Sequence, residues 1–139
     1  MRAILTSPDN RVRAFLAAGH VCAVMGFWEY HPIAAEFGVP IVVTGFEPLD
    51  LVRGVLAAIR QLNEGRAEVE NAYARVVGER GSVEAQRIIA EVFELGSRGW
   101  RGIGDIPSSG LRLRPAYARF DAGRRFDVGR VRSAESSIC

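Results

Sequence analysis

Apolar and polar residues follow each other along the chain in blocks that predict alternating strands and helices. Two short apolar runs, residues 12–17 and 40–44, predict strands. The second run is apolar and mostly β-branched, which is typical of a strand buried on both faces of a parallel sheet. Helical stretches follow at about His20, over residues 32–37 and over residues 48–63. This order predicts an α/β domain with a small parallel sheet and flanking helices.

The helix predicted over residues 48–63 carries an apolar stripe along one side. Large apolar residues recur at helical spacing, which is typical of an amphipathic helix. The stripe consists of Leu49, Val52, Leu56 and Ile59, widened by Val55 and Leu62. A second amphipathic helix is expected over residues 82–94, and a shorter helical piece over residues 68–73.

Glycine, proline and arginine become frequent after residue 96. We expect an irregular C-terminal segment there, with short extended pieces over residues 100–103 and 111–114 and one helical turn over 117–120. The expected domain covers residues 1–126, and residues 127–139 are expected to begin a linker.

Composition places the chain among globular proteins. It has 139 residues, of which 48% are hydrophobic and 24% charged, as in one ordinary folded domain. No apolar stretch is long enough to cross a bilayer and no signal peptide is visible, so a cytoplasmic protein without a membrane partner is expected.

All 18 basic residues are arginine. GC-rich coding DNA explains this composition, and recruitment of arginine for phosphate or carboxylate recognition is the alternative. Residues 111–139 hold seven arginines against three acids. A nucleic-acid-binding face over residues 111–132 would bind with a steep salt dependence. No recognised nucleic-acid motif is present, and we expect no nucleic-acid partner.

Candidate functional residues follow the two predicted strands directly. Residues 18–20 come after the first strand and residues 45–50 after the second. In open parallel sheets, ligands bind beyond the carboxyl ends of the strands. If the two strands are neighbours, His20, Glu47 and Asp50 share one crevice.

Each of these residues also has a purely structural explanation. His20 is a candidate acid, base or metal ligand, but a loop histidine can also hydrogen-bond nearby backbone. Glu47 and Asp50 flank a proline at a helix start, where free N–H groups and the helix dipole favour acids. Cys22 lies near a helix N-terminus and is a candidate reactive thiol, although a lone cysteine in an apolar stretch is more often packed.

Several segments together resemble the HypD family of hydrogenase formation proteins. The most specific are AGHVCAVMG at residues 18–26 and GFEPLD at residues 45–50. Further matches occur in order along nearly the whole chain: NEG at 63–65, VENAY at 69–73, WRG at 100–102, IPSSGL at 106–111 and FDA at 120–122. Two departures are mild, since Ala18 stands where the family motif has proline and Cys22 where it has serine.

The resemblance implies a scaffold function. HypD family members work with the small chaperone HypC, and together they form the scaffold on which the Fe(CN)2CO moiety of [NiFe]-hydrogenase is assembled. Cyanide arrives from HypE in complex with HypF. The family fold has two similar α/β domains that face a cleft, and a cysteine-rich C-terminal part with a [4Fe-4S] cluster. Both motifs line that cleft, so the resemblance makes His20, Cys22, Glu47 and Asp50 residues that position the iron moiety or the partners.

The resemblance implies that the chain is short for this family and corresponds to its second α/β domain alone. Its two cysteines, Cys22 and Cys139, are too few for a disulfide framework or a four-cysteine metal site. The resemblance makes Cys139 a candidate first cluster ligand in a longer protein. We expect a fragment that by itself binds neither the cluster nor Fe(CN)2CO, exposes apolar surface and can self-associate.

Two functions from different classes remain at this point. The favoured one is the assembly scaffold, to which the resemblance assigns no catalytic residue. The alternative is a stand-alone small α/β enzyme that uses His20 and Glu47 as an acid–base pair.

Overall fold

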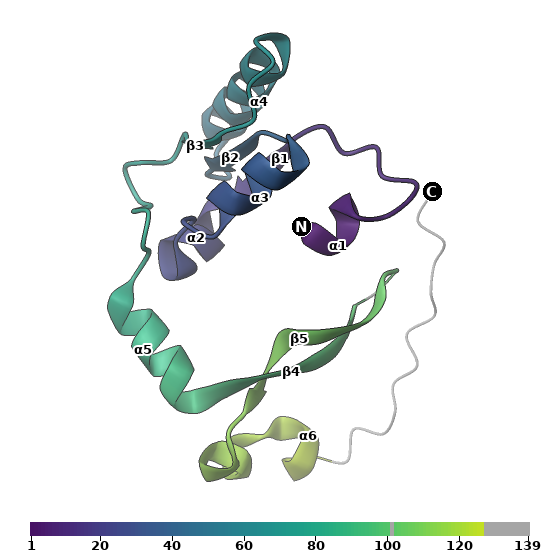
Figure 1. Ribbon diagram of the computed structural model, residues 1–139. Coiled ribbons are helices and arrows are strands. Elements are labelled where there is room, and N and C mark those ends of the chain that lie inside the picture. Colours follow the sequence, from purple (N-terminus) through teal and green to yellow (C-terminus); the bar gives the residue numbers. More distant parts are fainter. Residues whose placement is uncertain (101, 127–139) are drawn as a thin grey trace. The chain divides into compact units, whose positions relative to one another are not determined.

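The computed structural model describes residues 1–100 and 102–126 (Figure 1). The chain divides into two units, Met1–Gln86 and Arg87–Cys139. The first unit contains α1 (Arg2–Leu5), β1 (Phe15–Ala18), α2 (Gly19–Met25), α3 (Tyr30–Phe37), β2 (Ile41–Thr44), α4 (Pro48–Asn63) and β3 (Val69–Asn71). Helix α5 (Val83–Val92) begins in the first unit and ends in the second. The second unit continues with β4 (Phe93–Trp100), β5 (Gly104–Leu113), the 3-10 helix Pro115–Phe120 and α6 (Ala122–Arg125).

A parallel three-stranded sheet in the order β1-β2-β3 forms the centre of the first unit. The middle strand, β2, is buried along its whole length. Its first residue, Ile41, pairs with Phe15 of β1 and with Val69 of β3. The predicted α/β class, with a small parallel sheet and flanking helices, is confirmed.

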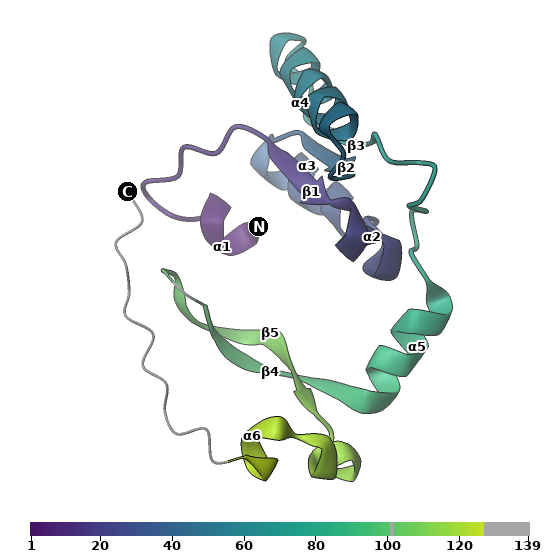
Figure 2. The same ribbon diagram turned by 180° about the vertical axis from the view of Figure 1, so that it is seen from behind.

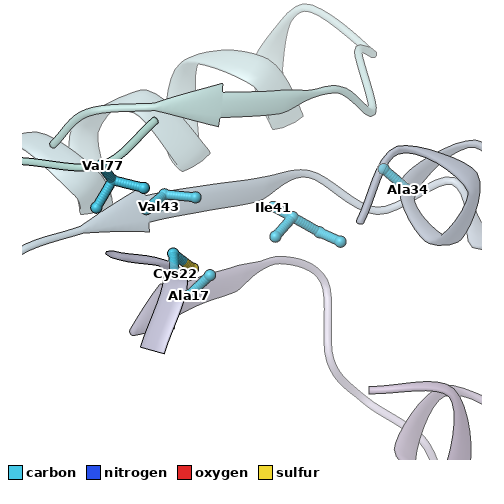
Figure 3. Close-up of a cluster of buried hydrophobic side chains, with 6 residues drawn as sticks. All are labelled: Ala17, Cys22, Ala34, Ile41, Val43 and Val77. Carbon is cyan, nitrogen blue, oxygen red and sulfur yellow. The ribbon is translucent and has the colours of Figure 1, made fainter. Parts of the chain in front are cut away.

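Alternate side chains of β2 point to opposite faces of the sheet. Ile41 and Val43 belong to a hydrophobic cluster to which α2 and α3 also contribute; its other members are Ala17, Cys22, Ala34 and Val77 (Figure 3). Val42 points to the opposite face and packs against Ala57 and Ala58 of α4. The sheet therefore lies between α2 and α3 on one face and α4 on the other (Figure 2).

Helix α4 spans the predicted residues, but its apolar stripe does not face the sheet. All seven of its large apolar side chains are exposed: Leu49, Leu51, Val52, Val55, Leu56, Ile59 and Leu62. The side that is buried consists of Asp50, Gly54, Ala57, Ala58 and Gln61. The reason is steric. A Cβ on Gly54 would already lie 3.0 Å from Cβ of Thr44, so at this turn the helix lies too close to the sheet for a larger side chain. The larger buried residues, Asp50 and Gln61, lie nearer the two ends of the helix.

Strand β3 lies within the piece for which a helix was predicted, residues 68–73, and that prediction was wrong. Backbone bonds to the middle strand hold it there: Ile41 N donates to Glu68 O at 3.1 Å, and Ala72 N donates to Val43 O at 2.9 Å. Pairing with β2, which lies far away in the sequence, outweighed the weak local preference of these residues for a helix.

The second unit contains an antiparallel hairpin. Strands β4 and β5 pair from Phe93 with Leu113 to Trp100 with Gly104, with a register shift between Gly96 and Arg98. The piece expected over residues 111–114 lies in β5 up to Leu113. The piece expected over residues 100–103 was mostly wrong, because only Trp100 belongs to a strand and residues 102–103 form the turn between β4 and β5. The 3-10 helix Pro115–Phe120 contains the predicted helical turn.

None of the described helices is both long and apolar enough to span a bilayer. The expected linker, residues 127–139, lies outside the described residues, and the domain boundary before it stays a prediction.

Candidate functional site

The carboxyl ends of the three parallel strands lie at one edge of the sheet. His20 follows β1 as the second residue of α2, and Glu47 and Asp50 follow β2. The loop after β3 adds Tyr73 and Arg75, which the sequence analysis did not single out as site residues.

Arg75 connects the two carboxylates at this edge. Its Nη1 donates to Asp50 Oδ1 at 2.7 Å and its Nη2 to Asp50 Oδ2 at 2.6 Å. The same Nη2 donates to Glu47 Oε2 at 3.0 Å. The Asp50 side chain is only 2% exposed, whereas the Arg75 side chain is about half exposed. Asp50 is therefore a buried carboxylate compensated by a bidentate ion pair.

This ion pair shifts both pKa values in the direction that favours charge. The hydrogen bonds from Arg75 hold the pKa of Asp50 below its ordinary value of 3.8, although desolvation acts in the opposite direction. The hydrogen bonds to Asp50 in turn raise the pKa of Arg75. Both groups are charged at neutral pH.

Helix capping does not explain Glu47. It occupies the N-cap position of α4, yet its side chain makes no capping hydrogen bond. The Glu47 side chain instead reaches Arg75 and remains 75% exposed. Part of this carboxylate thus stays accessible to other groups.

The ring of Tyr73 packs against the guanidinium group of Arg75. The Arg75 Cζ atom lies 4.5 Å from the ring centroid, within the range of a cation–π contact. The ring lies close to two glycines: a Cβ on Gly19 would lie 2.6 Å from Tyr73 Cδ1, and one on Gly45 would lie 2.7 Å from Tyr73 Cε2. The ends of β1 and β2 therefore need glycine where the ring packs on them.

Asn71 shapes the loop that carries Tyr73 and Arg75. Its Oδ1 accepts from Tyr73 N at 3.0 Å, and its Nδ2 donates to Val77 O at 2.8 Å. Such side-chain bonds stabilise a turn. The asparagine at the end of β3 thereby directs the chain back toward β2.

His20 is exposed and lies against Phe46, with ring centroids 5.0 Å apart at a tilt of 43°. Within the described residues no hydrogen bond or ion pair joins His20 to Glu47. The imidazole at the start of α2 thus packs against a ring from the loop after β2, and no described residue hydrogen-bonds its nitrogen atoms.

Cys22 is fully buried in the hydrophobic cluster of Figure 3. Its Sγ lies 3.7 Å from the Tyr30 hydroxyl, to which it donates, and burial raises the pKa of the thiol. Burial also raises the pKa of Tyr30, to about 12. This environment agrees with the packing interpretation of Cys22 and keeps the thiol protonated at neutral pH.

The described residues do not fit an iron–sulfur cluster. Over residues 1–100 and 102–126, no group of three or more His, Cys, Asp or Glu side chains could hold a metal ion. A [4Fe-4S] cluster ordinarily takes four cysteine ligands, and this chain has two, of which Cys22 is buried beside Tyr30. Cys139, the candidate first ligand, lies outside the described residues.

Tyr73 and Arg75 were missed because residues 68–73 were predicted to be helical. With a strand there, the residues after Asn71 lie beyond the carboxyl end of a parallel strand, as His20 and Glu47 do. The sequence had a weak signal, since residues 67–70 alternate between apolar and charged and are followed by Asn71, as in a strand that ends at a turn.

Comparisons with known proteins agree along the whole chain. The family model HypD, described as "Hydrogenase formation hypA family", matches residues 1–139. Hydrogenase maturation factor HypD of Escherichia coli is 46% identical over 140 residues, which cover all of this chain and 36% of the relative. HypD of Rhodobacter capsulatus is 45% identical, and HypD2 of Bradyrhizobium diazoefficiens is 42% identical, each over 146 residues.

The chain spans 38% of the Bradyrhizobium relative and 39% of the Rhodobacter relative, while both alignments cover it completely. Identity of 42–46% over alignments that cover the whole chain shows common descent with these relatives. The chain belongs to the HypD family of hydrogenase formation proteins, as the motifs at residues 18–26 and 45–50 predicted.

Proposed function

We propose that this chain acts in [NiFe]-hydrogenase maturation, as one part of a HypD-type scaffold on which the Fe(CN)2CO moiety is assembled. The family match along all 139 residues carries this proposal. The partners implied by the resemblance are a HypC-type chaperone and HypE, which delivers cyanide together with HypF. The chain spans under two fifths of the relatives named above, so the activity of the whole scaffold is part of the proposal.

The strand-end edge is the proposed surface for the iron moiety or the partners. His20 offers an exposed imidazole, and Glu47 a carboxylate that is 75% exposed. Cyanide is an anionic ligand that accepts hydrogen bonds, and imidazole and guanidinium groups are suitable donors to it. In this proposal His20 and Arg75 face the iron moiety, Asp50 holds Arg75 in position, and the exposed carboxylate of Glu47 contacts a partner protein.

The two cysteines have different places in the proposal. Cys22 supports the helix that carries His20 from inside the hydrophobic cluster and does not itself touch the iron moiety. Cys139 remains a predicted cluster ligand that would act only together with cysteines of a longer polypeptide.

The alternative of a stand-alone enzyme is not supported. An acid–base pair needs His20 and Glu47 to act on the same proton path. Here the Glu47 carboxylate binds Arg75 and the His20 ring packs on Phe46, and the relatives named above are hydrogenase maturation factors.

A chimera tests the proposal in a setting where the remaining scaffold is present. The aligned segment of Escherichia coli HypD is replaced by residues 1–139 of this chain, in a strain that lacks its own HypD. We expect the chimera to restore hydrogenase activity in cell extracts. His20→Ala and Glu47→Ala are expected to abolish this activity while the chimera accumulates at its normal level.

Two matched controls distinguish a local role from a general one. His31→Ala changes the other histidine, whose side chain is 49% exposed, and Glu64→Ala changes a half-exposed glutamate that also pairs with an arginine. Both are expected to leave maturation intact. Normal maturation with His20→Ala and Glu47→Ala would contradict the site assignment, and a folded chimera that never matures hydrogenase would contradict the function.

A further inference from the structure

Helix α4 presents a broad apolar surface that its own unit does not cover. The α4 apolar face consists of Leu49, Leu51, Val52, Val55, Leu56, Ile59 and Leu62. Exposure of these side chains ranges from 38% at Leu51 to 64% at Val52. An ordinary surface helix buries this kind of stripe and exposes its polar side, so α4 has the opposite arrangement.

The apolar surface extends from α4 onto the sheet. Leu16 of the edge strand β1 is 42% exposed. It lies next to the helix, since a Cβ on Gly54 would be 3.3 Å from Leu16 Cδ2. In α/β folds the faces of a parallel sheet are covered by helices, and α4 covers this face over β1 and β2. The exposed leucine beside it marks a place where a further helix fits.

The exposed charges within α4 are of one sign, and Glu64, which follows the helix as its C-cap residue, is paired with Arg66. The flank of the α4 apolar face carries Arg53 and Arg60, and neither forms a salt bridge within the described residues. The only acid within α4 is Asp50, which is buried and bound to Arg75. A complementary surface therefore carries carboxylates beside its apolar residues.

A second copy of the chain meets this requirement poorly. Arg53 and Arg60 lie seven residues apart and therefore on the same side of the helix. If two α4 helices paired antiparallel about a two-fold axis, the arginine flank of one would lie against the arginine flank of the other. The like charges disfavour that dimer.

We propose that the α4 apolar face docks an amphipathic helix of a partner protein, whose apolar stripe is bordered on one side by aspartate or glutamate. The 16 residues of α4 make a surface about 24 Å long, which corresponds to a partner helix of about four turns. This surface lies on α4, and the proposal does not depend on the role of His20 or Glu47.

Two helical peptides of about four turns provide the test. Both carry a leucine stripe and a fluorescent label; one has glutamates along one flank, and the other has lysines there. Fluorescence anisotropy measures their affinity for the 139-residue chain. We expect the glutamate peptide to bind at least about tenfold more tightly than the lysine peptide. Combined Arg53→Glu and Arg60→Glu substitution should reverse this preference.

Substitutions on the helix locate the binding surface. Val52→Glu and Ile59→Glu should each weaken binding of the glutamate peptide by about tenfold or more, because a buried carboxylate would replace an apolar contact. Both side chains are exposed, so the fold should persist, which circular dichroism checks. Val83→Glu is the matched control, since Val83 on α5 is also an exposed valine.

Three results would overturn the proposal. The first is equal affinity for the two peptides, and the second is binding that Val52→Glu does not weaken. The third is a concentration-dependent dimer, seen by sedimentation and removed by Val52→Glu, which would assign the α4 apolar face to a second copy of the chain.

Discussion

The guanidinium group of Arg75 binds both carboxylate oxygens of Asp50, although the two residues lie 25 positions apart in the chain. Asp50 lies in the first turn of α4, after β2, and Arg75 lies in the loop after β3. The ion pair thus joins the carboxyl ends of two neighbouring strands. Glu47 binds the same guanidinium at 3.0 Å, so one residue orders most of the polar groups at this edge.

The Arg75–Asp50 pair predicts acid sensitivity. Because the pKa of Asp50 is lowered in the folded state, its ionisation stabilises the fold above the pKa of the unfolded chain, about 3.9. That contribution is lost as pH falls from about 4 through the lower pKa of the folded state. Urea unfolding at a series of pH values from neutral to about 3 measures this loss of stability. The free energy of unfolding of Asp50→Asn should decline less steeply with falling pH than that of the unchanged chain.

Removal of the arginine is the complementary change. Arg75→Ala leaves a buried carboxylate without its partner and should destabilise the chain at neutral pH. The control, Arg66→Ala, removes an arginine that pairs with the exposed Glu64 and Glu68 and should cost less. Equal losses for the two variants, or identical pH profiles for Asp50→Asn and the unchanged chain, would contradict this account.

The packing of Tyr73 on the strand-end glycines predicts that Gly45 tolerates no side chain. A Cβ there would lie 3.0 Å from Asp50 Cγ and 2.7 Å from Tyr73 Cε2. Gly45→Ala should lower the free energy of unfolding by about 1–3 kcal/mol, as overpacking does elsewhere. Gly78→Ala is the control, because a Cβ on Gly78 meets nothing within 4 Å. Thermal and urea unfolding of both variants measure the difference, which should vanish if neither the Tyr73 ring nor the Asp50 carboxylate packs there.

The orientation of α4 predicts an unusual pattern of substitution effects. Leu56→Ala should change the free energy of unfolding by no more than about 0.5 kcal/mol, because Leu56 is 44% exposed. Ala57→Leu should cost about 1–3 kcal/mol, because Ala57 packs against Val42 of the sheet. Urea unfolding of the two variants shows which side of α4 packs against the sheet. A large loss for Leu56→Ala together with a tolerated Ala57→Leu would mean that the helix presents its other side to the sheet.

The buried position of Cys22 predicts that its thiol reacts slowly with thiol reagents. With Cys139→Ser in place, Cys22 is the sole cysteine of the chain. Burial raises the pKa of its thiol, so Ellman's reagent at neutral pH should react with the folded chain at least about 100-fold more slowly than with the urea-unfolded chain. The reaction should depend on local opening of the cluster. A similar rate in both states would show that the thiol is accessible at the site.

Some of the residues at the strand ends could be predicted from the sequence and others could not. His20 and Glu47 were found because each follows a strand that local pattern predicts well. Arg75 was not found, because the strand before it, β3, has only three residues and is held by backbone bonds to β2 rather than by its own pattern. A short edge strand becomes apparent only when its partner is known.

The sequence by itself determined the order of the main elements, the bounds of α4 and the family, because helix starts, β-branched runs and collinear motifs are local features of the chain. The tertiary structure decided which side of α4 is buried, where Arg75 binds and that Cys22 is enclosed. Periodicity shows that a helix has an apolar side, but the space left above Thr44 is tight even for a Cβ on Gly54, and the side that fits there is the one with small residues. Contacts between residues far apart in the chain, which no local pattern contains, set that space.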